Sequence, residues 1–186
     1  MSDLVERVTG DMNILQKIVS KVPGFSGYMD LNNRRSADKL LRETIASHFE
    51  SLWQRLSSIQ KDLITEGGLQ YTSKIESASI KLRQFIDRVR TASYGYAGFF
   101  DAVKIKKEEL DRVYQYDLAL LTLEEEVGRS IDNLEAAIGT DGMPASIRDL
   151  TKKAQACLDT FNHRQEEMIG GVEPSQTPPA AQNPGN

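Results

Sequence analysis

Two carboxylates, Asp117 and Glu124, have the type and spacing that most directly suggest chemistry in this sequence. Both continue the apolar stripe of the longest expected helix, so they lie on or beside the surface that this helix buries. A buried carboxylate needs a charged or hydrogen-bonding partner. One interpretation pairs the two acids with an arginine of the preceding helix, Arg83, Arg88 or Arg90. The other, favoured because charged residues are seldom fully buried, places both acids at the edge of the stripe with their carboxylates in water.

Histidine occurs twice, and neither copy has the neighbours of a di-iron or nucleophile site. Di-iron bundles use Glu-x-x-His motifs, but Ile45 and Thr160 stand three residues before His48 and His163. A weaker set of three metal ligands shares one face of the last helix: Asp159, His163 and Glu167. Such sets recur by chance on polar helix faces. We therefore predict no catalytic residue, no metal site and no cofactor.

The sequence motifs do not support binding of phosphate or of nucleic acid. Neither G-x-x-x-x-G-K-[ST] nor G-x-G-x-x-G occurs in the sequence. The run from Gly95 to Gly98 matches the G-x-x-G of a KH loop, but the mixed α/β context of that loop is not expected here. A net charge of −4 also disfavours nucleic acid. The sequence does not specify a small-molecule ligand.

An aromatic and glycine-rich segment, residues 93–101, has the most unusual local composition in the chain. One interpretation is a recognition loop for a partner or a ligand. The favoured one is a plug that closes the end of the bundle against Phe25 and Tyr28, because buried aromatics in loops usually serve packing. The residues that carry either role are Tyr94, Gly95, Tyr96, Gly98, Phe99 and Phe100.

The periodicity of apolar residues predicts an all-α fold, an elongated antiparallel helical bundle with coiled-coil-like packing. Three long core helices are expected at 34–66, 69–92 and 107–138, with two flanking amphipathic helices at 2–21 and 145–168. The connection at Gly67-Gly68 is so short that the helices on either side must be antiparallel, and a glycine there supplies the left-handed conformation at a helix C-terminus.

Charge is distributed unevenly between two consecutive segments. Residues 69–107 contain eight basic and three acidic residues, whereas residues 108–141 contain two basic and ten acidic residues. We expect the two segments to lie side by side, where opposite charge favours one register over its alternatives.

Three parts of the chain are predicted: an N-terminal amphipathic helix (1–24), a bundle domain (25–170) and a disordered proline-rich tail (171–186).

The N-terminus lacks the layout of a signal peptide. The longest uncharged run before the proline-rich tail, residues 91–100, is shorter than the ~20 residues of a spanning helix. A single cysteine, Cys157, falls on an apolar stripe, which indicates a small buried residue. We expect a cytoplasmic protein.

These observations favour a non-catalytic interaction or scaffold protein that binds a protein partner or associates with itself. The alternative is a peripheral membrane-associated protein that uses helix 2–21. It is disfavoured because the charges of this helix cancel, whereas helices that lie on membranes are rich in lysine and arginine. An enzyme or a metal-binding bundle comes third.

Overall fold

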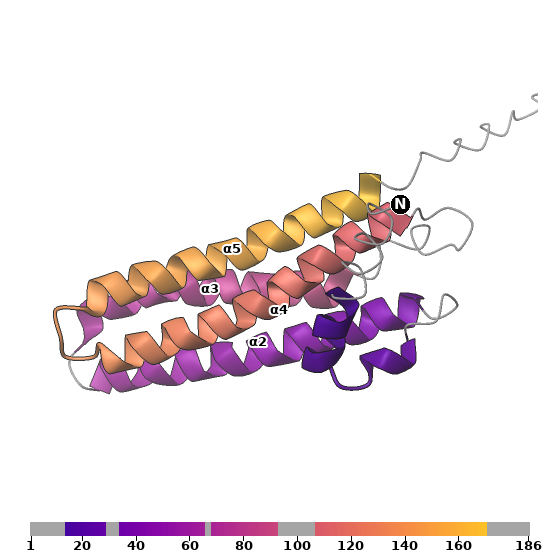
Figure 1. Ribbon diagram of the computed structural model, residues 1–186. Helices are drawn as coiled ribbons and strands as arrows, with labels where there is room; N and C mark the ends of the chain where they lie inside the picture. The colour runs from indigo at the N-terminus through magenta and orange to yellow at the C-terminus, as the bar shows by residue number, and fades with distance from the viewer. Residues whose placement is uncertain (1–13, 29–33, 66–67, 93–106, 171–186) are drawn as a thin grey trace, which may run out of the picture.

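The computed structural model describes residues 14–28, 34–65, 68–92 and 107–170, and the regular structure of these residues is helical. Residues 14–21 form a short helix, and a 3₁₀ turn, η1, follows at Phe25–Tyr28. Four long helices make up the body: α2 (Arg34–Thr65), α3 (Leu69–Thr91), α4 (Lys107–Ala136) and α5 (Met143–Gly170). Figure 1 shows them side by side along one long axis. The predicted all-α helical bundle is confirmed.

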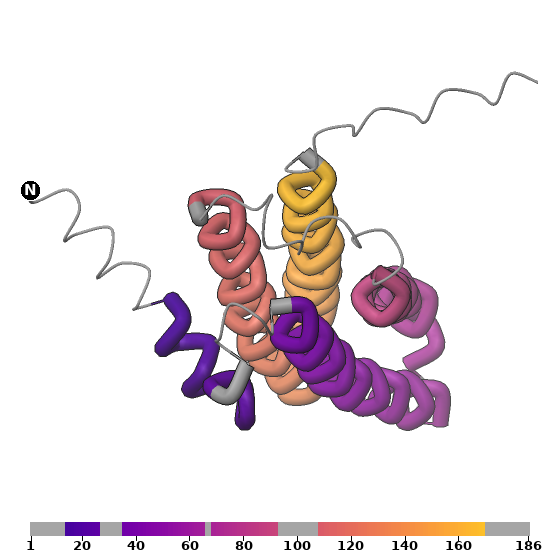
Figure 2. Tube along the Cα trace, turned by 90° about the vertical axis from the view of Figure 1, so that its right-hand side faces the viewer, coloured from indigo at the N-terminus to yellow at the C-terminus, as the bar shows by residue number. Residues whose placement is uncertain are grey.

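The four helices run alternately up and down, with α2 and α5 at opposite corners of the cross-section (Figure 2). Packing joins α2 to α3 and α4, and joins α5 to the same two helices. The N-termini of α2 and α4 therefore meet the C-termini of α3 and α5 at one end of the bundle (Figure 1). The last helix, expected to flank three core helices, packs along α3 and α4 and completes a bundle of four.

The expected pairing of the basic and acidic segments is wrong for the described helices. The basic helix α3 and the acidic helix α4 occupy opposite corners, and each packs on α2 and α5 instead of on the other. The physical reason is the length of the connection, residues 92–106, which does not force consecutive helices to be neighbours as a two-glycine turn does. Each of the two helices still pairs with oppositely charged side chains, but these side chains belong to α2 or α5.

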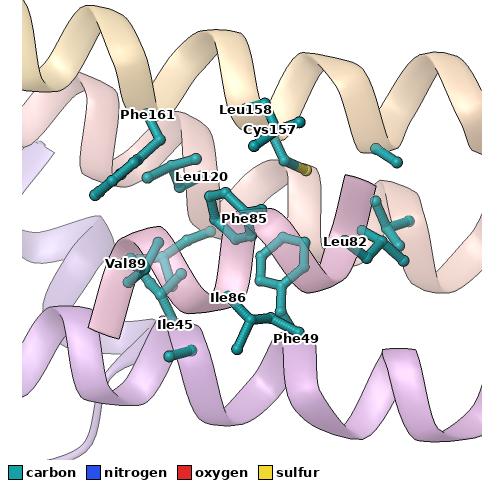
Figure 3. Packing of buried hydrophobic residues seen from close by; sticks show 14 of the residues in the cluster. Ile45, Phe49, Leu82, Phe85, Ile86, Val89, Leu120, Cys157, Leu158 and Phe161 are labelled. Atoms are coloured by element: carbon teal, nitrogen blue, oxygen red, sulfur yellow. The ribbon is translucent and has the colours of Figure 1, made fainter. Parts of the chain in front are cut away.

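Aromatic side chains link three helices in the middle of the core. Phe49 of α2 packs on Phe85 of α3 with ring centroids 4.6 Å apart, and Phe85 packs edge-on against Phe161 of α5 at 6.0 Å. Figure 3 shows these rings among aliphatic side chains from facing helices. Edge-to-face pairs of this kind stabilise by about 0.5–1.5 kcal/mol each beyond the apolar area that they bury.

Residues 14–28, here called the N-terminal segment, lie beside α2 and α4 near the end of the bundle (Figure 2). Ile18, Val22 and Phe25 are buried to 0–1% exposure and belong to the same hydrophobic core as the four long helices. The ring of Phe25 meets that of Tyr114 on α4 edge-on, at 6.2 Å. The core of the bundle therefore continues past the predicted boundary at residue 24.

The two short connections use glycine for different reasons. Gly139, after α4, has φ +76°, a conformation that favours glycine. Gly68 has φ −82°, so it does not adopt the left-handed conformation expected at this turn. A Cβ on Gly68 would lie 2.8 Å from Leu63 Cδ2, so its lack of a side chain serves the close approach of the chain to α2. Gly67 lies outside the described residues.

Candidate functional site

Four charged side chains are buried together at the end of the bundle where α2 and α4 begin. This ionic cluster consists of Asp38 and Arg42 of α2, Asp117 of α4 and Arg164 of α5. Their side chains are 7%, 6%, 1% and 1% exposed, respectively. Two carboxylates and two guanidinium groups give the cluster no net charge. Charged residues are rarely this buried unless they are paired, and these four form the candidate site.

Arg164 is the centre of the cluster. Its Nε donates to Asp117 Oδ1 at 2.5 Å and its Nη2 donates to Asp117 Oδ2 at 3.1 Å. These two parallel bonds form the bidentate geometry in which a guanidinium group binds a carboxylate most strongly. Nη2 also donates to Asp38 Oδ1, and Nη1 lies 3.0 Å from the sulfur of Met168. One side chain of α5 therefore joins α4 to α2.

Arg42 extends the cluster to the remaining helix. Its Nε donates to Asp38 Oδ2 at 2.9 Å, one turn away on α2. Its Nη1 donates to the carbonyl oxygen of Val89, in the last turn of α3, at 3.2 Å. The bond also satisfies a carbonyl near a helix C-terminus, where backbone acceptors lack helical partners. Through these bonds the cluster contacts all four long helices.

The local sequence explains why these charges point inward. Asp38 lies on α2 beside Ala37 and Leu41, both 0% exposed. Arg164 lies between Phe161 and Met168 at helical spacings of three and four, so the stripe that buries those two side chains buries the arginine as well. Asp117 occupies the corresponding place on α4, and each charge therefore meets its partner inside the bundle.

Burial and pairing act in opposite directions on the ionisation of this cluster. Burial raises the pKa of Asp117 above its ordinary value, although the positive charge of Arg164 opposes that shift. For Arg164, burial lowers the pKa, but the charges of Asp117 and Asp38 outweigh it and the net pKa is raised. Arg164 therefore stays charged, and its positive charge opposes the effect of burial on Asp117.

The geometry of the ionic cluster suits a structural role better than a chemical one. A group that acts on a substrate must reach it, and Asp117 and Arg164 are closed to solvent. A buried ionic network costs desolvation energy, and its attested benefit in other proteins is to select one arrangement of helices over others. In this bundle the cluster joins groups of all four long helices near one end.

The two carboxylates singled out in the sequence lie in different environments. Asp117 is fully buried with Arg164, a partner on α5 and not on the preceding helix. The side chain of Glu124 is 25% exposed and lies 2.9 Å from Nδ1 of His48 on α2, at the edge of the bundle.

The arginines considered as partners for those two acids bind elsewhere. Arg83 and Arg90 donate to Glu50 of α2. Arg88 donates to the side-chain oxygen of Asn162 on α5. All three therefore join α3 to its actual neighbours, α2 and α5.

The three residues considered as metal ligands on the last helix are held apart by separate contacts. Asp159 accepts a bond from Gln155, His163 lies 3.1 Å from Glu166, and Glu167 accepts from Arg112 at 2.7 Å. In the part of the chain that the structure describes, no three His, Cys, Asp or Glu side chains gather as metal ligands would.

Cys157 is fully buried, as its place on the apolar stripe indicates. Burial raises the pKa of its thiol from 9.0 to about 12. The reactive thiolate is therefore scarce at neutral pH, and Cys157 behaves as a small apolar residue.

The outer face of α3 carries a shallow depression of about 360 Å³, lined by residues of that helix: Ser73, Glu76, Ser77, Ile80, Lys81 and Gln84. Its two charged side chains are engaged with neighbouring helices, Glu76 with Gln60 and Lys81 with Gln155. Ile80 is 48% exposed beside it. Single exposed apolar residues are normal on protein surfaces, so this face does not define a site.

Trp53 is the single tryptophan of the chain and lies between α2 and α3. Its indole nitrogen donates to Ser79 Oγ of α3 at 3.0 Å. The guanidinium carbon of Arg83 lies 5.2 Å from the ring centroid, within the range of a cation–π contact. Trp53 therefore touches α3 through both its ring and its polar atom.

The aromatic segment singled out in the sequence (Tyr94, Gly95, Tyr96, Gly98, Phe99 and Phe100) lies outside the described residues, as does the predicted tail 171–186. Within the described ranges, no helix combines the length and the apolar composition needed to cross a membrane. Comparison with protein-family models, with curated proteins and with solved structures finds no match.

Proposed function

We propose that this protein is a non-catalytic, cytoplasmic interaction or scaffold protein, whose rigid helical bundle binds a protein partner. The observation that carries the proposal is the way the bundle holds the N-terminal segment. The place beside α2 and α4 accepts a short helix and buries Ile18, Val22 and Phe25 almost completely. A surface that takes an amphipathic helix in this way uses a common mode of protein recognition.

The polar side chains of the bundle also support this function. The most deeply buried charged groups, those of the ionic cluster, bind one another across helices. Between α4 and α5, Glu126 pairs with Lys153, and the buried Ser130 donates to Asp149 at 2.6 Å. These side chains bind one another between helices, so recognition of a partner depends on the outer surface of the bundle.

The test is to purify the tagged full-length protein from its native host and cross-link it before purification. Mass spectrometry then identifies partners and the bundle residues to which they are linked. We expect a reproducible, stoichiometric protein partner, or a second copy of the chain, with cross-links concentrated on α2 and α4. A protein that purifies alone and as a monomer at its cellular concentration would contradict the proposal.

A flotation assay separates this function from association with membranes. The apolar side chains of residues 14–22 face the bundle, and burial there competes with burial in a bilayer. We expect the full-length protein to remain at the bottom of the gradient with vesicles rich in anionic lipid. Salt-sensitive flotation would favour the membrane function instead.

A further inference from the structure

We propose that the groove between α2 and α4 is a regulated binding site for an amphipathic, basic helix of a partner protein, and that the N-terminal segment occupies this groove until the partner displaces it. This inference rests on the proposed interaction function and adds the location of the site, the chemistry of the partner and an autoinhibitory contact.

The first support is the pattern of the apolar residues in the N-terminal segment. Ile18 lies on the short helix, and Val22 and Phe25 follow it, in the turn that leads into η1 and at the first residue of η1, so a helix and the turn after it provide the apolar anchors. Each is buried to 0–1% exposure. Burial of such side chains is favourable because it removes apolar surface from water, and an empty groove would expose that surface.

The second support is the contrast between this apolar contact and the polar bonds of the segment. Two backbone bonds of the segment remain inside it, from Val22 N to Ile18 O and from Phe25 N to Val22 O. Lys21 forms an ion pair with Glu125 of α4, but these side chains are 29% and 52% exposed. Exposed pairs contribute little. The segment is therefore held mainly by non-directional apolar burial, which another helix of similar pattern can replace.

The third support is charge. Residues 14–28 contain two lysines and no acidic residue, whereas α4 contains nine acidic and three basic residues. Glu125, which receives Lys21, is one of three consecutive glutamates on α4. Opposite charge of this kind selects partners and suppresses wrong ones. The groove therefore fits a short amphipathic helix followed by a turn, with lysine or arginine placed to meet Glu125.

Covalent attachment explains why a partner would need to compete. A tethered segment has an effective concentration in the millimolar range, so a free helix of equal intrinsic affinity binds the intact protein weakly. Weakening the internal contact should therefore increase affinity for a free helix without adding any new contact.

The experiment uses full-length protein and a synthetic peptide of residues 14–28 as the probe, with binding measured by isothermal titration calorimetry. The variant Ile18→Asp/Val22→Asp places two acids where the segment buries apolar side chains. We expect it to bind the peptide at least tenfold more tightly than the wild type does, on the scale set by removal of an internal competitor. A peptide that carries the same two aspartates should not bind.

Gln16→Asp is the matched control, because Gln16 lies on the exposed side of the same helix. It introduces the same side chain without disturbing the groove, and it should bind the peptide as weakly as the wild type. Circular dichroism must show wild-type helix content in each variant. A folded Ile18→Asp/Val22→Asp variant that does not bind the peptide would overturn this inference, while a partner cross-linked elsewhere on the bundle would leave the general interaction function standing.

A charge exchange provides an independent test that leaves the apolar core intact. Lys21→Glu removes the ion pair and sets two glutamates against each other, so the peptide, which keeps Lys21, should bind more tightly than to the wild type by about threefold. Adding Glu125→Lys restores an internal pair of reversed sign, and peptide binding should fall again. Equal peptide affinity in all three proteins would contradict the assigned contact between the segment and α4.

Discussion

The two ends of the bundle use the same chemical groups in different surroundings. Near the start of α2, Arg164 binds Asp117 and Asp38 with 1–7% of each side chain exposed. Near the other end, Arg55 of α2 binds Asp132 and Glu135 of α4, and these three side chains are 42%, 59% and 54% exposed. Each arginine joins two carboxylates across helices. Exposure to water therefore distinguishes the two sites, and the comparison isolates what burial does to an ion pair.

Removing one partner from the buried end should cause the largest change. Arg164→Met leaves Asp117 without its guanidinium partner, in a place from which water is excluded, and leaves Asp38 with Arg42 alone. We expect a loss of about 3–5 kcal/mol in the free energy of unfolding, the usual effect of leaving a buried charge uncompensated. Urea denaturation followed by circular dichroism measures it.

Arg148→Met is the matched control, because Arg148 is exposed on the same helix. Its unfolding midpoint should stay close to that of the wild type. If the two variants lose equal stability, the buried environment of Arg164 does not have the energetic effect inferred from its exposure.

Replacing the whole ionic cluster should have a smaller effect than breaking it. The variant Asp38→Leu/Arg42→Leu/Asp117→Leu/Arg164→Met removes every charge of the cluster and its desolvation cost together. We expect its unfolding free energy to equal that of the wild type or exceed it by up to about 4 kcal/mol. Urea denaturation is again the measurement, and a loss as large as that of Arg164→Met would show that the pairing itself is strongly favourable.

Two-dimensional NMR spectra of the same variant address the arrangement of the helices. If the cluster selects one packing of the four helix ends, its removal should broaden or multiply the amide signals near Asp38 and Arg164. A single sharp set of signals would show that the apolar core fixes the arrangement without the charges.

At the exposed end, Arg55→Met should cost no more than about 1 kcal/mol, because surface ion pairs gain little over hydration. The difference from the wild type should shrink further in 1 M NaCl, where screening is strong. Urea denaturation at low and high salt checks both statements, and a salt-independent loss of several kcal/mol would contradict them.

The smallest expected effect concerns the ion pair of the N-terminal segment. The hydrogen bond and positive charge of Lys21 lower the pKa of Glu125 from its ordinary value of 4.5. A lowered carboxylate pKa favours the paired state above the ordinary pKa, and this contribution is lost as pH falls through the lowered value. An NMR titration of the Glu125 side chain should show its pKa rising toward 4.5 in Lys21→Met. An unchanged pKa would indicate that the pair does not form in solution.

Much of the fold could be predicted because it depends on a local pattern. Apolar residues at spacings of three and four gave the helices, and the predicted ranges 34–66 and 69–92 end within one residue of α2 and α3. The neighbour relations of α3 and α4 could not be obtained in this way. A connection as long as residues 92–106 allows α4 to lie either beside α3 or at the opposite corner of the bundle. Net charge does not decide between these two positions, because α2 and α5 can also supply the opposite sign.

The ionic cluster shows a different limit of sequence reasoning. Asp117 could be singled out because it interrupts an apolar stripe, and the same signal was available at Arg164, which lies three residues after Phe161 on the stripe of α5. The burial of Asp38 and Arg42 was harder to predict, since they belong to a run rich in charges at the start of α2. The partner of a buried charge depends on which helices are neighbours, so Arg164 could not be assigned to Asp117 before the packing was known.

The setting of Trp53 makes the molecule its own optical reporter. Because the chain has a single tryptophan, its tryptophan fluorescence arises from one indole, which is half-buried between α2 and α3 and hydrogen-bonded to Ser79. Separation of these two helices would move the ring into water and shift its emission to longer wavelength. Fluorescence would then report the opening of one helix pair while circular dichroism reports the whole helix content, and a difference between the two unfolding curves would reveal whether the α2–α3 hairpin opens before the rest of the bundle.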